Sequence, residues 1–288
     1  MATYVLYHDD ADGYASALSA YLPLGNDATY IAVQYGQDFP VKDLRDHDTV
    51  YILDFSYPKE ILEDIHSKVK QLVVIDHHET AMRQLDHLPY AIFDMTKSGA
   101  RLSWEYFHPN IEVPEIILLV EDRDLWKFTL EDTKAFDAGM RAAGKYTDIH
   151  FWAVVYVDTV LRNKIIEDGR LLVRDLESRI KSFVKNPSKY RVVDINGHRV
   201  VVYNATDNIS ELGNAFNTTL DIDYSISYFF TNKGELVLSY RGVKGRVHVG
   251  DICQKLGGGG HAAAAGVKLP IEAGLAWLNN IYQKQEVK

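Results

Sequence analysis

Short apolar runs that end directly in acidic or histidine residues constrain the fold of this chain more than any other feature. Residues 72–75 (Leu-Val-Val-Ile) run straight into Asp76-His77-His78. Runs of this kind are typical of buried strands in a parallel sheet. Because loops beyond the carboxyl ends of such strands line the ligand crevice, three potential metal ligands fall where a ligand would bind.

The same pattern recurs elsewhere in the chain. Residues 4–7, 50–53 and 116–120 are further apolar runs, and Pro114 predicts that the last of them is a helix rather than a strand. The polar residues that follow these runs are His8, Asp10, Asp12, Asp54, Asp122 and Asp124. Carboxylates with a few imidazoles suit divalent ions such as Mn²⁺ or Mg²⁺. A pair of such ions, bridged by a shared carboxylate, generates hydroxide and stabilises the attacking and leaving oxygens of an in-line displacement at phosphorus.

These motifs together resemble the DHH phosphoesterase superfamily. The matching residues, in the family's order, are His8-x-Asp10-x-Asp12-Gly13, Asp54, Asp76-His77-His78, Asp122-Arg123-Asp124 and, far downstream, Gly257-Gly258-Gly259-Gly260-His261. The last motif resembles the glycine-rich signature of the DHH-associated C-terminal domain. The resemblance therefore extends over nearly the whole chain.

The resemblance implies a site that holds two Mn²⁺ ions, with Mg²⁺ or Co²⁺ as substitutes. Asp54 is the expected bridging carboxylate, Asp76 is expected to orient an imidazole, and His78 to contact the substrate phosphate. Asp122 is favoured as a ligand over Asp124, which could be a ligand, a partner that orients a ligand or a salt-bridge residue with Arg123. The expected metal ligands are His8, Asp10, Asp12, Asp54, His77 and Asp122, and the expected catalytic residues are Asp54, Asp76, His77 and His78.

The division of the first motif between the two metals stays open. Some branches of the family place carboxylates four and six residues after the histidine, where this chain has Asp12 and Tyr14. Asp10 would then supply the other carboxylate. For substrate binding the resemblance implies Arg241, Gly258, Gly259, Gly260 and His261, with Lys244 and Arg246 as weaker candidates.

The chain of 288 residues is long enough for two domains. Strands alternate with amphipathic segments in the first half, which predicts a parallel α/β sheet. Residues 148–184 are compatible with one long helix that only Gly169 interrupts, and residues 186–188 (Asn-Pro-Ser) break it. We therefore predict a catalytic domain at 1–187 and a smaller α+β substrate-binding domain at 188–288, with the active site in the cleft between them.

Charge and composition narrow the class of partner. Residues 1–187 carry a net charge of −11, whereas residues 188–288 carry +2. An acidic body disfavours binding to long duplex DNA, which depends on many contacts between basic residues and phosphates. No apolar run approaches the roughly 20 residues that a membrane helix needs. With one cysteine, Cys253, and no signal-like N-terminal stretch, a cytoplasmic location is expected.

The expected activity is hydrolysis of short single-stranded oligonucleotides or dinucleotides to mononucleotides. Two alternatives share the same site chemistry: a phosphomonoesterase acting on 3′-phosphoadenosine 5′-phosphate and a cyclic-dinucleotide phosphodiesterase. A catalytically inactive nucleotide-binding regulatory protein is an alternative of a different class. A nicotinamide-dependent enzyme is disfavoured because no Gly-x-Gly-x-x-Gly follows the first strand. A homodimer is compatible with the sequence, which leaves the oligomeric state open.

Overall fold

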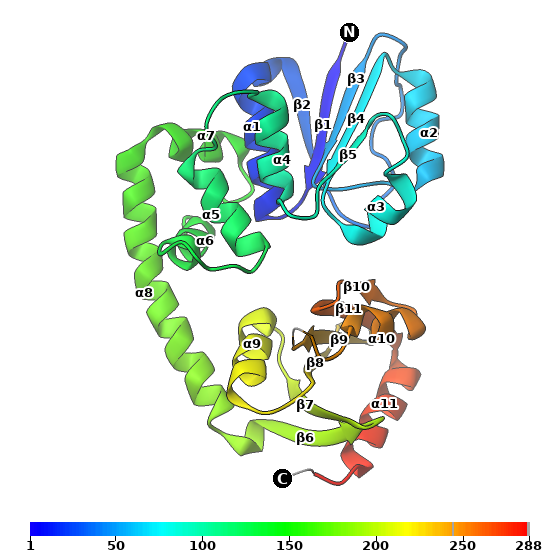
Figure 1. Ribbon diagram of the computed structural model, residues 1–288, viewed down its shortest axis with the longest axis vertical. Helices are drawn as coiled ribbons and strands as arrows, with labels where there is room; N and C mark the ends of the chain where they lie inside the picture. The colour runs from blue at the N-terminus through cyan, green and yellow to red at the C-terminus, as the bar shows by residue number, and fades with distance from the viewer. Residues whose placement is uncertain (244, 287–288) are drawn as a thin grey trace. The chain divides into compact units, whose positions relative to one another are not determined.

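The protein is described from a computed structural model that defines residues 1–243 and 245–286. The chain divides into two compact units, Met1–Arg174 and Asp175–Lys288. Each unit has its own sheet (Figure 1). Each also has its own hydrophobic core. Lys244, one of the weaker substrate-binding candidates, lies outside the described residues.

Unit 1 is built on a five-stranded sheet whose neighbouring strands all run parallel, in the order β2-β1-β3-β4-β5. The strands are β1 (Thr3–His8), β2 (Ala28–Val33), β3 (Thr49–Leu53), β4 (Gln71–Asp76) and β5 (Ala91–Phe93). Strands β1, β3 and β4 are adjacent, so their carboxyl ends meet at the centre of one sheet edge. This is the edge at which the sequence motifs converge.

Helices cover both faces of this sheet (Figure 1). Successive strand residues point to opposite faces, so Val5 and Ile75 enter the core under α1 and α4, whereas Leu6 and Val74 enter the core under α2 and α3. The helices of this part of the chain are α1 (Ala11–Leu24), α2 (Lys59–Lys68), α3 (Glu79–Leu85), α4 (Gly99–Phe107), α5 (Glu115–Asp124), α6 (Thr133–Ala142), α7 (Ile149–Val157) and α8 (Thr159–Val184), with a short 3₁₀ turn η1 (Gly25–Asp27).

Unit 2 contains a six-stranded mixed sheet in the order β10-β11-β9-β8-β7-β6, in which only β7 and β8 pair in parallel among the described strands. Asn196 and Gly197 both have positive φ and join β6 to β7, as a two-residue hairpin turn requires. The strands are β6 (Tyr190–Ile195), β7 (His198–Asn204), β8 (Tyr224–Phe230), β9 (Glu235–Gly242), β10 (Gly259–Gly260) and β11 (Ala264–Pro270).

Helices also pack on both faces of the second sheet. Helix α9 (Ile209–Thr219) buries Phe216 beside Phe183 and Val184 at the end of α8. Helices α10 (Val249–Lys255) and α11 (Ile271–Gln283) cover the opposite face, and a 3₁₀ turn η2 (Pro187–Lys189) precedes β6. The predicted fold class, a parallel α/β domain followed by an α+β domain, is confirmed.

The long helix predicted over residues 148–184 is instead two helices. Asp158 lies between α7 and α8 with a non-helical backbone, and its carboxylate accepts hydrogen bonds from the N–H groups of Val160 and Leu161. Such a cap begins a new helix. The compact units divide within α8, because its C-terminal end packs in unit 2, whereas the sequence-based boundary at residue 187 follows the breaker residues and stays a prediction.

Over residues 1–243 and 245–286, no helix combines the length and the apolar character needed to cross a membrane.

Candidate metal centre

Three adjacent strands bring acidic and histidine side chains together at one edge of the unit 1 sheet. His8 is the last residue of β1, Asp54 directly follows β3, and His77 directly follows β4. The His77 Nε2 atom lies 3.2 Å from Asp54 Oδ1, and the His8 Nδ1 atom lies 3.8 Å from Asp54 Oδ2. The two imidazoles therefore approach different oxygens of one carboxylate.

Asp54 occupies a constrained position at the centre of this group. Its φ is 56°, in the left-handed region, and its N–H donates to the Ile75 carbonyl at 2.8 Å, which holds the turn against β4. A Cβ at Gly99 would lie 2.5 Å from the Asp54 carboxylate, so only glycine fits there. Asp54 is 1% exposed, yet neither oxygen accepts a hydrogen bond from any described residue. A buried carboxylate without donors requires another partner, and a cation is the natural one.

Three overlapping sets of described residues have ligand atoms within 4.8 Å of one another. The first contains His8, Asp10 and Asp54; the second contains Asp12, His77 and Asp124; and the third contains Asp54, His77 and His78. Asp54 belongs to two sets and borders His77 of the remaining one. The geometry thus offers two neighbouring cation positions on either side of Asp54.

Asp10 and Asp12 are held by the amino ends of two helices. The Asp10 carboxylate caps α1 by accepting from the Gly13 N–H at 3.0 Å, and it lies 2.8 Å from His8 Nδ1. The two Asp12 oxygens accept from the N–H groups of Gly99 and Ala100 at the start of α4, at 2.7 and 3.0 Å. Each carboxylate oxygen keeps a second lone pair for a cation.

Asp76 positions the two histidines that follow it. Its Oδ1 accepts from His78 Nδ1 at 2.6 Å and from the N–H groups of both His77 and His78, while Oδ2 accepts from the Ser56 hydroxyl at 2.6 Å. The side chain is fully buried. With these contacts made inside the loop, Asp76 fixes the ring of His78 rather than facing a ligand directly.

The pKa values of the group follow from burial and crowding. Burial, reinforced by the negative charges of Asp12 and Asp10, raises the pKa of Asp54 well above its usual range, and the same causes raise the pKa of Asp124. Burial also lowers the pKa of His77, which favours the neutral imidazole that a metal requires. Burial alone would lower the pKa of His78 too, but the hydrogen bond and charge of Asp76 raise it.

Asp122 lies outside these three sets, so its predicted role as a ligand stays a prediction. Its carboxylate turns toward the loop after α5, where it accepts hydrogen bonds from Thr129, Leu130 and Thr133. Asp124, the alternative, does belong to one set, with Oδ2 3.6 Å from His77 Nε2. Residues two positions apart on a helix face nearly opposite sides, so only one of this pair can point to the sheet edge.

Apart from His78, which lies in unit 1, the predicted substrate-binding residues lie in unit 2. Arg241, near the end of β9, donates to the Ser210 hydroxyl and to the Tyr240 carbonyl, and its side chain passes directly over Gly213. Gly258 directly precedes β10, which consists of Gly259 and Gly260, and the His261 N–H donates to the Ala264 carbonyl at 2.7 Å. Their role in substrate binding stays a prediction.

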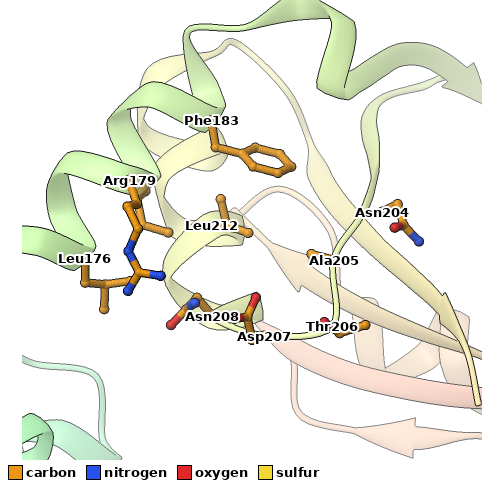
Figure 2. A pocket seen from close by; sticks show the side chains of 10 residues that line it. Leu176, Arg179, Phe183, Asn204, Ala205, Thr206, Asp207, Asn208 and Leu212 are labelled. Carbon is orange, nitrogen blue, oxygen red and sulfur yellow. The ribbon is translucent and has the colours of Figure 1, made fainter.

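Unit 2 also contains a pocket of about 310 Å³ that no sequence motif indicates. Figure 2 shows it between helix α8 and the loop of residues 204–208, with Phe183 and Leu212 among its apolar side chains. None of the predicted site residues lines it. It is therefore separate from the residues that the motifs singled out.

Comparisons with known proteins agree with this architecture. The DHHA1 domain family matches residues 197–284. Oligoribonuclease NrnB of Bacillus subtilis (strain 168) is 24% identical over 308 aligned positions, which span 93% of this chain and 73% of NrnB. These matches support the DHH superfamily with a DHHA1 domain. Members of this superfamily are phosphoesterases.

A further relative comes from a virus. An uncharacterized protein of Acanthamoeba polyphaga mimivirus is 28% identical over 283 residues; the match spans 91% of this chain but 66% of that protein, just under two thirds.

Among solved structures, the DHH domain of a member of the s1p family of ribosomal proteins has a TM-score of 0.62 at 14% identity, covering 99% of this chain and 87% of that chain. The pGpG-specific phosphodiesterase PggH from Vibrio cholerae has a TM-score of 0.57 at 19% identity, covering 99% and 100%. RecJ from Thermus thermophilus, solved in complex with Mn²⁺, has a TM-score of 0.54 at 12% identity, covering 97% and 51%. These likenesses confirm the fold.

Proposed function

We propose that the protein is a divalent-metal-dependent phosphodiesterase that hydrolyses short oligonucleotides or dinucleotides to mononucleotides. One observation carries the proposal: Asp54 is buried, both of its oxygens lack hydrogen-bond donors among the described residues, and it stands between two sets of carboxylate and imidazole ligands. Two cations on either side of a shared carboxylate are the arrangement used for displacement at phosphorus.

The donor chemistry fits Mn²⁺. Carboxylate oxygens with a few neutral imidazoles suit ions between the hard and borderline classes. His8 and Asp10 would hold one ion, Asp12, His77 and Asp124 would hold the other, and Asp54 would bridge them. RecJ, which has the same fold, was solved with Mn²⁺, and this supports the choice of ion.

The bound ions would supply a hydroxide nucleophile at neutral pH and stabilise the charge that develops on the phosphoryl oxygens. The protein itself contributes orientation. Asp76 holds the ring of His78 in one position and favours its charged form, so His78 presents a positive donor to a substrate phosphate. Asp12 accepts hydrogen bonds from two backbone N–H groups, so its carboxylate stays in place when the substrate binds.

The choice of substrate rests on the relatives. NrnB is named as an oligoribonuclease and PggH as a phosphodiesterase specific for pGpG, and both names describe short nucleotide chains. Arg241, Gly258, Gly259, Gly260 and His261 would bind a further phosphate of such a chain. An arginine suits this role because its planar guanidinium can contact two phosphate oxygens.

A substrate panel with a matched pair of variants tests the proposal. The panel contains a 5′-phosphorylated dinucleotide, a five-residue RNA, a cyclic dinucleotide, 3′-phosphoadenosine 5′-phosphate and polyphosphate, each assayed with Mn²⁺ and with EDTA. We expect chelator-sensitive turnover of the first two substrates. Asp54→Asn should abolish both turnover and Mn²⁺ binding, and asparagine is chosen because it tolerates a left-handed backbone.

Asp46→Asn is the control, since the Asp46 side chain is 98% exposed and lies outside the metal-ligand sets. It should behave as the unmodified protein. Near-full activity of Asp54→Asn would refute the metal centre. Turnover of 3′-phosphoadenosine 5′-phosphate or of the cyclic dinucleotide alone would replace the proposed substrate. Metal binding without any turnover would instead indicate a binding protein.

A further inference from the structure

An exposed aromatic side chain stands beside the metal centre and has no role in the function proposed above. Tyr35 follows strand β2 and is 55% exposed. Burying a tyrosine ring is favourable, so a ring this exposed at the edge of a polar site calls for an explanation.

A tight turn holds Tyr35 in place. The Gln37 N–H donates to the Gln34 carbonyl at 3.1 Å, and Gly36 has a φ of 84°, so Tyr35 occupies the second position of a type II turn. The Gln37 side chain accepts from the Gln34 N–H, while the Gln34 side chain donates to Asp9, which neighbours His8. The turn is therefore tied to the loop that carries the first metal-binding motif.

The Tyr35 ring also lies close to two predicted site residues. Its centroid is 5.2 Å from that of His8 and 5.9 Å from that of His78, and both pairs meet edge to face. On another side it packs against buried Phe55 at 4.7 Å. The Tyr35 ring thus packs against the apolar side chain of Phe55 and borders the imidazole of His78, which is expected to contact phosphate. Much of the ring surface stays exposed to solvent.

We propose that the Tyr35 ring is a stacking surface for a nucleobase of the substrate, adjacent to the phosphodiester that the metal centre would hold. This rests on the proposed function and narrows it to substrates that carry bases. A rigid ring loses little conformational entropy when it binds another ring, and stacking tolerates any base. The acidic groups around Tyr35 disfavour a second phosphate at this position, because Asp9 and Asp10 lie on the neighbouring loop.

The experiment measures the contribution of the Tyr35 ring separately from that of its hydroxyl group. It also measures the contribution of the base separately from that of the phosphate. Tyr35→Phe keeps the ring, and Tyr35→Ala removes it. Each variant is given a 5′-phosphorylated dinucleotide and the same compound with both bases absent. Dissociation constants are measured by calorimetry in EDTA, so that no turnover is needed, and KM is measured with Mn²⁺. Tyr282→Ala is the control, since Tyr282 is equally exposed, at 55%, on helix α11 of unit 2.

We expect Tyr35→Ala to weaken binding of the base-carrying dinucleotide about tenfold, which corresponds to the usual contribution of one stacked base. Binding of the abasic compound should not change. Tyr35→Phe and Tyr282→Ala should stay within about twofold of the unmodified protein, and thermal unfolding should confirm that all variants are folded.

The stacking role is overturned if Tyr35→Ala binds both compounds as the unmodified protein does, or if it loses both equally. It is also overturned if Tyr35→Phe is as weak as Tyr35→Ala, because the hydroxyl would then be the contact. Failure of the proposed function looks different: the unmodified protein would hydrolyse no dinucleotide with Mn²⁺, while the base-dependent difference in dissociation constants would still support the platform.

Discussion

Two acidic residues of helix α5 have separate tasks. Asp122 is 3% exposed, and its carboxylate accepts hydrogen bonds from Thr129, Leu130 and Thr133. These bonds hold the loop after α5 against the helix. Asp124 points to His77 and the metal centre. We therefore expect Asp122 to act on stability and Asp124 on metal binding.

Exchanging each carboxylate for its amide should separate these tasks. Asp122→Asn replaces one accepting oxygen with an NH₂ group, which would face the donors of Thr129, Leu130 and Thr133. This substitution should lower the free energy of unfolding by about 2 kcal/mol, with little change in Mn²⁺ affinity. Asp124→Asn should weaken Mn²⁺ binding by more than about tenfold without lowering the stability of the metal-free protein. Urea unfolding in EDTA and calorimetric titration with Mn²⁺ measure the two effects. The opposite pattern would restore Asp122 as the ligand.

Asp122 should also affect how the free energy of unfolding changes at acid pH. Burial alone would raise the pKa of Asp122, but the hydrogen bonds from Thr129 and Thr133 outweigh it and lower the pKa below the usual value. A lowered pKa contributes stability that is present above the ordinary carboxyl pKa, about 3.9, and is lost as the pH falls through the folded-state pKa.

The difference in unfolding free energy between the unmodified protein and Asp122→Asn should therefore be constant near neutral pH and shrink on acidification below about pH 4. Urea unfolding in EDTA at a series of pH values gives this difference directly. A difference that grew on acidification would show that the Asp122 pKa is raised instead.

At the level of single residues, part of the candidate site was predictable from sequence. His8, Asp54 and His77 lie together because each ends or follows a strand of one parallel sheet, and strand ends were visible as apolar runs. The choice between Asp122 and Asp124 was not predictable, because it depends on the rotation of α5 about its axis. Tyr35 was missed because the apolar run of residues 30–33 that precedes it is not followed directly by an acidic or histidine residue.

Among the elements, the glycine segment before β11 shows how a run of identical residues conceals different constraints. A Cβ at Gly258 would lie 2.1 Å from the Gly266 carbonyl oxygen, and Gly260 has a φ of 140°. A Cβ at Gly259 would meet no described atom within 4 Å, and Gly259 has no positive φ. The fold therefore requires glycine at positions 258 and 260 but not at position 259.

Alanine at each position should distinguish folding from substrate binding. Gly258→Ala should lower the unfolding temperature because backbone would have to shift to admit the methyl group. Gly259→Ala should unfold as the unmodified protein does, yet raise KM for a dinucleotide if a phosphate approaches this backbone closely. An unchanged KM for a folded Gly259→Ala would remove Gly259 from the substrate-binding residues.

Helices α6 and α8 show why helix limits were harder to predict than strands. Gly169 looked like an interruption, but it lies inside α8, where a Cβ would be 1.8 Å from the Ala135 carbonyl oxygen of α6. Gly139 of α6 similarly approaches the Ile165 carbonyl oxygen of α8. These glycines allow two helix backbones to touch, a tertiary contact that periodicity alone does not reveal.

For the whole molecule, the decisive quantity is the negative charge gathered at one sheet edge. Residues 1–187 carry a net charge of −11, and Asp10, Asp12, Asp54 and Asp124 lie around the same two imidazoles. Mutual repulsion and burial raise the pKa of Asp54, which means that the folded protein without metal bears an electrostatic cost. Cations that bind only the folded chain should remove that cost.

Thermal unfolding should therefore depend on Mn²⁺ and on EDTA. At a free Mn²⁺ concentration one hundred times the dissociation constant, binding at one site should stabilise the folded protein by about 2.7 kcal/mol, and EDTA should reverse the gain. Asp54→Asn should be at least as stable as the unmodified protein in EDTA, because a crowded buried carboxylate is removed, but it should gain little from Mn²⁺. Calorimetric scans of both proteins with Mn²⁺ and with EDTA make the comparison. Equal stabilisation of both proteins by Mn²⁺ would place the stabilising ion elsewhere, because the centre proposed here cannot form without the Asp54 carboxylate.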